Sequence, residues 1–149
     1  MSLSKNVFIV HGHDKAMKEA VESILLELGL SPIILSEQPN KGKTLIEKFE
    51  NNAENAGFAV VLMSDRDDKG RPCYSKKELT HRARQNVILE LGYFMAKLGR
   101  NHICVLKKPK VEEPSDILGI VYTTYDKSGS WKDELKKELK AIGYQWNPY

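Results

Sequence analysis

The six residues FAVVLM, from Phe58 to Met63, are apolar without interruption. A strand with one face in water alternates apolar and polar side chains, whereas a strand covered on both faces is apolar throughout. Shorter runs of the same kind lie at residues 7–10 (VFIV), 33–35, 103–106 and, more weakly, 120–125. Because doubly covered strands are typical of parallel sheets, the sequence predicts a parallel sheet.

Amphipathic stretches separate these runs and predict helices. Asp14 is a suitable N-cap for the first helix, and Gly29 is a suitable stop for it. The expected helices cover residues 15–28, 43–56 and 82–98, and a last one follows Trp131. The side chains expected to face inward are Ala16, Ala20, Ile24 and Leu28 in the first helix and Leu45, Ile46 and Phe49 in the second.

The resulting order, βαβαβαβ followed by a weaker βα unit, predicts a three-layer α/β domain. We expect a single domain over residues 6–145, with residues 1–5 as a tag or disordered lead outside it. No apolar run approaches the roughly 18 residues that a membrane-spanning helix needs, and the amino terminus has no signal-peptide pattern. The sequence therefore predicts a cytoplasmic protein that does not bind a membrane.

The composition argues against several classes of function. A net charge of +3 is too small to predict nucleic-acid binding. The two cysteines, Cys73 and Cys104, fit neither a disulfide framework nor a metal-ligand spacing. His11 and His13 have a chelating spacing, but no nearby cysteine or paired carboxylate completes a site. We expect no metal and no bound cofactor.

Three polar loops that contain glycine or proline follow the first three predicted strands, at residues 11–14 (HGHD), 36–43 and 64–72. In a parallel α/β sheet the carboxyl ends of the strands line the ligand crevice, so these loops are candidate binding segments. The first loop is too short for the GxGxxG motif. The segment KGKT at 41–44 lacks the earlier glycine of a P-loop.

The stretch RARQNVILELGYF, residues 82–94, contains one carboxylate in an apolar setting. On a helical wheel Glu90 lies on a polar edge beside the apolar face, where partial burial is expected to raise its pKa unless a donor compensates. Pairing with Lys97 or an arginine is the alternative reading of Glu90. Gly92, which is unfavourable inside a helix, predicts a close backbone approach. The apolar face contains Ala83, Val87, Ile88, Leu91, Phe94, Met95 and Leu98, and the polar edge contains Asn86, Glu90, Tyr93 and Lys97.

The combination of VFIVHGHD, LGLSPIILSEQPNKGKTLIEKFE, FAVVLMSDRDD and RARQNVILELGYFMAKLGR resembles the bacterial TIR-like domains, long described as predicted nucleotide-binding proteins. These domains are fused to bacterial STING or to cyclic-nucleotide sensors in antiphage defence. The resemblance covers roughly residues 6–143. It implies a flavodoxin-like fold with a five-stranded parallel sheet.

In enzymatic members a glutamate on the third helix is required to cleave NAD+ at the nicotinamide–ribose bond, and the ELGYF motif carries that role to Glu90. NAD+ would be a substrate rather than a cofactor. Residues 36–43 match the loop that closes over the substrate and contacts neighbouring protomers, and residues 11–14 would border the same pocket. Arg82 or Arg84 could contact the pyrophosphate, and Lys41 and Lys43 compete for that role. The expected substrate-binding residues are His11, Gly12, His13, Asp14, Pro39, Asn40, Gly42, Ser64, Arg82, Arg84 and Asn86.

The resemblance leaves three functions open. The first is an NAD+ glycohydrolase that is activated by oligomerisation under a STING-like or cyclic-nucleotide-binding sensor in cis or in trans. The second is a non-catalytic module that signals by self-association, because the superfamily contains such members. The third is an enzyme like the nucleoside deoxyribosyltransferases, whose motifs we do not find in the chain.

Overall fold

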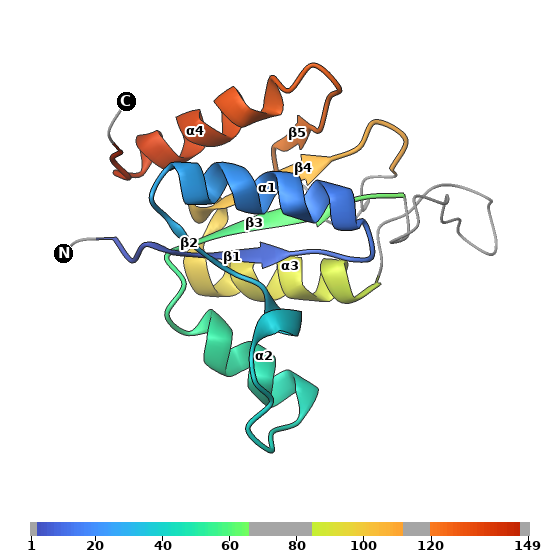
Figure 1. Cartoon of the computed structure of the whole chain (residues 1–149), viewed down its shortest axis with the longest axis vertical. Helices are drawn as coiled ribbons and strands as arrows, with labels where there is room; N and C mark the ends of the chain where they lie inside the picture. The colour runs from blue at the N-terminus through green and yellow to red at the C-terminus, as the bar shows by residue number, and fades with distance from the viewer. Residues whose placement is uncertain (1–2, 66–84, 112–119, 147–149) are drawn as a thin grey trace.

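The apolar runs form one sheet at the centre of the computed structural model, which describes residues 3–65, 85–111 and 120–146. Within these residues five parallel strands lie in the order β2-β1-β3-β4-β5 (Figure 1). The predicted five-stranded parallel sheet is confirmed, and its order is the flavodoxin-like one. The strands are β1 (Asn6–Val10), β2 (Ser31–Ile33), β3 (Phe58–Met63), β4 (Ile103–Lys107) and β5 (Tyr122–Thr124).

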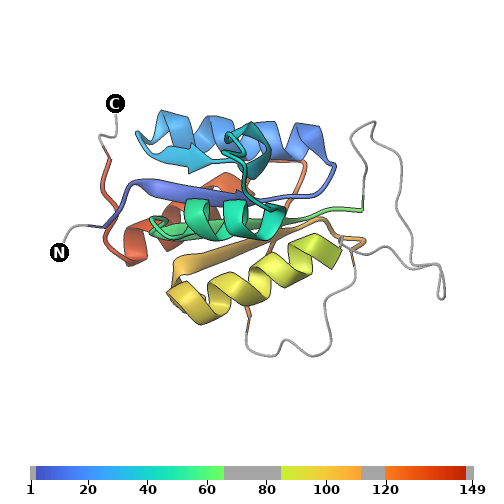
Figure 2. The same ribbon diagram turned by 90° about the horizontal axis from the view of Figure 1, so that it is seen from below.

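Helices cover both faces of the sheet, with α1 and α4 on one side and α2 and α3 on the other (Figures 1 and 2). None of the helices in the described ranges is both long and apolar enough to cross a membrane. The α-helices are α1 (Lys15–Glu27), α2 (Leu45–Ala53), α3 (Gln85–Leu98) and α4 (Trp131–Ala141), and the short 3-10 helices are η1 (Leu35–Glu37) and η2 (Arg100–His102).

Strand β3 explains the uninterrupted apolar run, because each of its six side chains is buried. Successive side chains of a strand point to opposite faces, so both helical layers need apolar partners from it. Phe58, Val60 and Leu62 pack in the layer under α1 and α4. Ala59, Val61 and Met63 pack in the layer under α2 and α3.

Helix α1 begins as predicted and ends one residue before the predicted end, and Ile24 and Leu28 are buried as predicted, but the rest of its inward face differs. The Asp14 side chain caps the helix by accepting a hydrogen bond from the backbone N–H of Met17. Ala16 is exposed, and Met17, Val21 and Leu25 occupy the core instead. Leucine, valine and methionine bury far more apolar area than alanine, so the larger side chains set the inward face.

The prediction for the first turn of α2 is wrong. Leu45 is 74% exposed and Ile46 is 59% exposed, although both were expected to face inward. Helix α2 is anchored further along by Phe49, whose ring packs edge-on against Phe8 at 5.5 Å. Figure 1 shows that α2 is tilted, with its first turn farther from the sheet than its last, and this tilt holds the two side chains away from the core.

Residues 3–5 also belong to the fold, contrary to the expectation of a lead outside it. Leu3 packs against the core, and the Ser4 carbonyl accepts a 2.6 Å hydrogen bond from the Tyr144 hydroxyl. The Lys5 carbonyl accepts a hydrogen bond from the backbone N–H of Ser31. These contacts fasten the chain before β1 to two distant parts of the molecule.

Two glycines form a matched pair for a stability test. A Cβ added at Gly57 would lie 2.7 Å from the Tyr144 hydroxyl and 2.8 Å from the Ser4 carbonyl, whereas a Cβ at Gly92 meets no described atom within 4 Å. We expect Gly57→Ala to destabilise the protein by about 1–3 kcal/mol. Gly92→Ala is expected to stabilise it by roughly 0.5–1 kcal/mol.

Urea unfolding of both variants checks this pair of predictions. Equal stability of Gly57→Ala and wild type would contradict the tight packing around Ser4. The close approach that Gly92 predicts was to the sheet or to a ligand. The open space at Gly92 means that no described part of the sheet approaches it, and an approach to a ligand stays a prediction.

Candidate active site

The loop between β1 and α1, residues 11–14, is held by the buried carboxylate of Asp14. Its Oδ2 atom accepts a hydrogen bond from the Ser64 hydroxyl, at the end of β3, and lies 2.6 Å from Nζ of Lys108, just past β4. Its Oδ1 atom accepts the bond from the Met17 N–H that caps α1. One carboxylate therefore joins the carboxyl ends of three neighbouring strands.

The charge of Asp14 is stabilised by these partners. Burial by itself would raise the pKa of the carboxyl, but the hydrogen bonds from Lys108, Ser64 and Met17 outweigh burial and hold the pKa below its usual value. Both oxygens are engaged within the protein. This arrangement favours a role for Asp14 in positioning the loop rather than in contacting a ligand.

His11 lies beside the second candidate loop. Its Nδ1 atom is 2.8 Å from the Gly12 carbonyl. Burial lowers the pKa of His11, the nearby Lys18 lowers it further, and Glu37 acts in the opposite direction. Nζ of Lys18 lies 4.0 Å from the Glu37 carboxylate, so α1 contacts η1 at the start of the second loop. Because its pKa is lowered, the His11 imidazole is neutral at neutral pH. His13, two residues later, is exposed.

Residues 36–43 form an exposed loop that ends in a tight turn. The Lys43 N–H donates a 2.9 Å hydrogen bond to the Asn40 carbonyl across Lys41 and Gly42. Both central residues have positive φ, +51° for Lys41 and +72° for Gly42. Glycine adopts this conformation freely, whereas a lysine does so at a cost of about 1–2 kcal/mol. The turn is thus a defined structure on the molecular surface.

Glu90 lies at the rim of the buried face of α3, as the helical wheel predicts. Leu91 and Phe94 are buried, and Glu90 is half-buried. Burial raises the pKa of Glu90 from 4.5 to about 7. No ion pair to Lys97 forms; the Lys97 ammonium lies 5.9 Å from the centre of the Tyr93 ring. At neutral pH this carboxyl exists in both protonation states, a property of groups that work as acids, bases or charge stabilisers.

The predicted site residues thus fall into three groups. The first group is residues 11–14 and Ser64, which are joined through Asp14. The second is the loop with Pro39, Asn40 and Gly42, whose start contacts α1 through the Lys18–Glu37 pair. Glu90 is the sixth residue of α3, about 7.5 Å along the axis from the helix start at the carboxyl edge of the sheet. In the described residues no hydrogen bond joins Glu90 to the other two groups. Arg82, Arg84 and the Asn86 side chain lie outside the described part of the structure.

Two residues near the site were not among the predicted ones. Lys108 pairs with Asp14, and Asp65, in the predicted loop at residues 64–72, is buried. Both line a cavity of about 530 Å³ at the ends of β3, β4 and β5. The polar segment KKPK, residues 107–110, lies at the carboxyl end of β4. Because ligands bind at the carboxyl ends of the strands, this segment could have been predicted from the sequence as part of the site.

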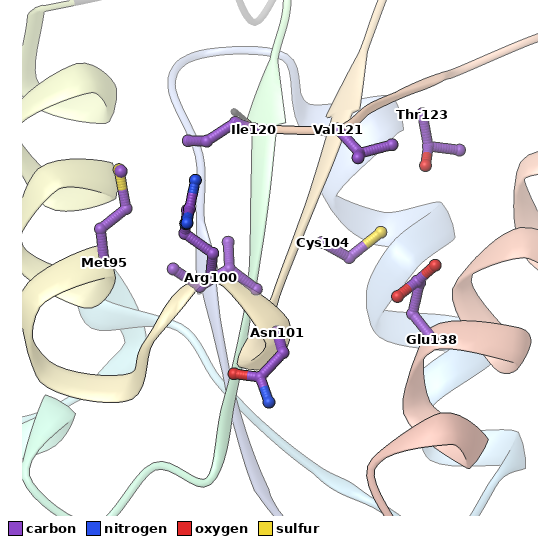
Figure 3. Close-up of a pocket in the computed structure, with 9 residues that line it drawn as sticks. Met95, Arg100, Asn101, Cys104, Ile120, Val121, Thr123 and Glu138 are labelled. Carbon is purple, nitrogen blue, oxygen red and sulfur yellow. The ribbon is translucent and has the colours of Figure 1, made fainter. Parts of the chain in front are cut away.

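A separate cavity of about 350 Å³ lies between α3 and α4 (Figure 3). Arg100 and Asn101, which line it, precede β4, whereas Lys108 follows β4. The two cavities therefore lie at opposite ends of that strand. Burial raises the pKa of the Cys104 thiol in its wall to about 12, which leaves no reactive thiolate. None of the predicted site residues that the structure describes lines this cavity.

The sheet order and the polar loops at the strand ends define an α/β domain of flavodoxin-like topology with a candidate ligand site at the carboxyl edge. Residues 6–127 match the family described as "CAP12/Pycsar effector protein, TIR domain". The chain belongs to this family of TIR effector domains. The resemblance inferred from the sequence is confirmed.

Two curated relatives support the same assignment. The uncharacterized protein YuaY of Escherichia coli (strain K12) is 46% identical over 141 residues, which are 95% of this chain and 46% of YuaY. Protein tirC of Dictyostelium discoideum is 37% identical over 152 residues, covering 93% of this chain and 72% of tirC. The chain therefore spans less than half the length of YuaY.

Proposed function

We propose that the protein is an NAD+ glycohydrolase that cleaves the nicotinamide–ribose bond and yields nicotinamide and ADP-ribose. The observation that carries this proposal is Glu90, a half-buried carboxylate with a pKa near 7 on the third helix of a TIR effector domain. An apolar residue at this position would have favoured a purely structural module.

A single carboxylate suffices for this reaction. Glycosidases need two carboxyl groups because an alkoxide leaving group must be protonated. The nicotinamide of NAD+ is a pyridinium and departs as a neutral molecule, so no general acid is required. Ionised Glu90 binds the ribose hydroxyls and stabilises the positive charge that develops on the sugar as nicotinamide leaves with the electron pair of the C1′–N bond. Water then adds to C1′ and releases one proton to the solvent. Partial burial strengthens this interaction, because the surrounding dielectric is lower than that of water.

Activation by self-association through residues 36–43 is part of the proposal. The exposed Leu45 and Ile46 begin α2 one residue after this loop, and neighbouring exposed apolar side chains are typical of a protein-contact surface. A STING-like or cyclic-nucleotide-binding sensor would drive the association in antiphage defence. The cytoplasmic location and the sensor stay predictions.

Clustered protein is expected to release nicotinamide from NAD+. The experiment concentrates the chain on a multivalent scaffold, adds NAD+ and follows nicotinamide by chromatography, with Glu90→Gln in parallel. Release by wild type alone supports the glycohydrolase. If clustered wild type and variant are equally inert, the chain is a self-association module, for which Leu45 and Ile46 are the supporting observation.

A further inference from the structure

A hollow of about 220 Å³ lies between the turn at residues 38–43 and helix α2. We propose that it binds the phosphate groups of an anionic ligand. Three of its lining residues are Lys41, Lys43 and Lys48, and the others are Gln38, Pro39, Asn40, Asn51 and Asn52. Every described lining residue except Pro39 can donate a hydrogen bond from its side chain, and none of these described residues carries a carboxylate.

Lys48 is the central residue of this site. It is only 8% exposed, and lysines are almost never buried to this degree without a partner. Among the described residues no ion pair or hydrogen bond engages its ammonium group. Its position is fixed, because the adjacent Phe49 packs against the rings of Phe8, Tyr93 and Phe94. Its aliphatic stem is therefore buried while its ammonium group opens into the hollow, where it can pair with an anion.

The turn supplies the other two charges. Lys41 has a left-handed backbone, which is uncommon for lysine and costs about 1–2 kcal/mol. Asparagine or glycine would remove this strain, so the lysine side chain itself is the feature of interest at this position. With Lys43 two residues later, the turn places two cations opposite Lys48.

Among the described residues no ion pair engages Lys41, Lys43 or Lys48. The carboxylate of Glu47, which accepts hydrogen bonds from the hydroxyl and N–H of Thr44, offsets part of the charge of Lys43. The amide nitrogens of Asn51 and Asn52 each donate a 2.8 Å bond to a carbonyl of α2, which fixes both side chains in the wall. The hollow is therefore a preformed basic pocket.

Its volume limits the ligand. Pockets that take a whole drug-sized molecule measure about 300–1,000 Å³, so this one fits a phosphate or pyrophosphate group while the rest of the ligand lies outside. Two ligands could supply such a phosphate group. The first is NAD+, through its pyrophosphate, and this assignment rests on the proposed function. The second is a separate phosphorylated ligand, and this assignment is independent of the proposed function.

Calorimetric titration of the intact chain with inorganic pyrophosphate tests the site. We expect Lys48→Met to weaken binding roughly tenfold or more, since a charge-assisted hydrogen bond contributes about 1.5–3 kcal/mol. Lys48→Arg is expected to retain binding, and Lys137→Gln, on the exposed surface of α4, serves as the matched charge control. Circular dichroism establishes that each variant is folded. Equal affinity of wild type and Lys48→Met, or no binding by wild type, would overturn the proposal.

A competition experiment separates the two sources. It uses Glu90→Gln protein, which leaves NAD+ intact under the proposed function, loaded with pyrophosphate. Displacement by NAD+ but not by nicotinamide riboside assigns the hollow to the dinucleotide. Pyrophosphate binding that NAD+ does not displace assigns it to a separate phosphorylated ligand. A chain that binds pyrophosphate through Lys48 yet never cleaves NAD+ would refute the glycohydrolase and leave this site intact.

Discussion

Glu90→Gln is expected to lower the rate of NAD+ cleavage roughly 100-fold or more at pH 8 and, in the same protein, to raise the free energy of unfolding. The activity falls because glutamine has no charge with which to stabilise the positive sugar in the transition state. The stability rises because the folded protein no longer holds an ionised carboxylate in a half-buried position. A residue that is unfavourable for folding and required for the reaction is typical of active sites.

The pH dependence fixes the sign of the stability change. The pKa of Glu90 is about 7 in the folded protein, above its ordinary value of 4.5, so the folded state binds the proton more tightly. Below pH 4.5 the carboxyl is protonated in both the folded and the unfolded protein, so the variant is no more stable than wild type. The gain grows between pH 4.5 and 7 and is complete above 7. Because the side chain is partly exposed, we expect about 1–2 kcal/mol.

Urea unfolding at pH 4 and pH 8, with nicotinamide release at each half unit between, measures both effects. Glu50→Gln, an exposed position on α2, serves as the control and is expected to change neither quantity. Wild-type activity should fall about tenfold for each pH unit below 7. If Glu90→Gln has the same free energy of unfolding as wild type at pH 8, the claim that burial destabilises the ionised carboxylate is refuted. If the variant cleaves NAD+ as fast as wild type, the catalytic role of Glu90 is refuted.

The strands and the position of Glu90 were predictable because each depends on local periodicity. Six apolar residues in β3 require cover on both faces, and the repeat of α3 places Glu90 at the edge of its apolar face whatever that face contacts. The first turn of α2 was not predictable in this way. Leu45 lies four residues before the buried Phe49 and so shares its face, yet the first turn of α2 lies farther from the sheet and leaves Leu45 exposed (Figure 1). Periodicity gives the direction of a side chain but not the tilt of its helix against the neighbouring layer.

The contacts around the candidate site depend on charge pairs between distant segments. Asp14 was predictable as a helix cap from its own neighbours, but its pairing with Lys108 spans more than ninety positions. In the sequence, nothing distinguishes Lys48 from an ordinary surface lysine on an amphipathic helix. Its burial depends on how the turn at residues 38–43 folds against α2, which no local pattern specifies.

Asp14→Ala is expected to destabilise the protein by about 3 kcal/mol, because it removes a helix cap and leaves the Lys108 ammonium without its partner. Asp14→Asn separates these contributions, since asparagine caps a helix as well as aspartate does but carries no charge. The pKa of Asp14 lies below the ordinary 3.8, so its contribution is complete above that pH and is lost as the pH falls through the folded value. Urea unfolding at pH 7 and pH 2.5 measures both variants.

A double-mutant cycle of Asp14→Asn with Lys108→Met then gives the energy of the pair, for which we expect a coupling of about 1–3 kcal/mol. Additive effects would show that the two charges are independent. The cycle also bears on function, because Asp14 carries the segment with His11 and His13 into the site. If the pair positions that segment, Asp14→Asn should raise the KM for NAD+ in clustered protein while leaving kcat near the wild-type value, since Glu90 lies on a different helix. A loss in kcat alone would show that Asp14 takes part in the chemical step. That result would contradict the positioning role that the partners of both its carboxylate oxygens indicate.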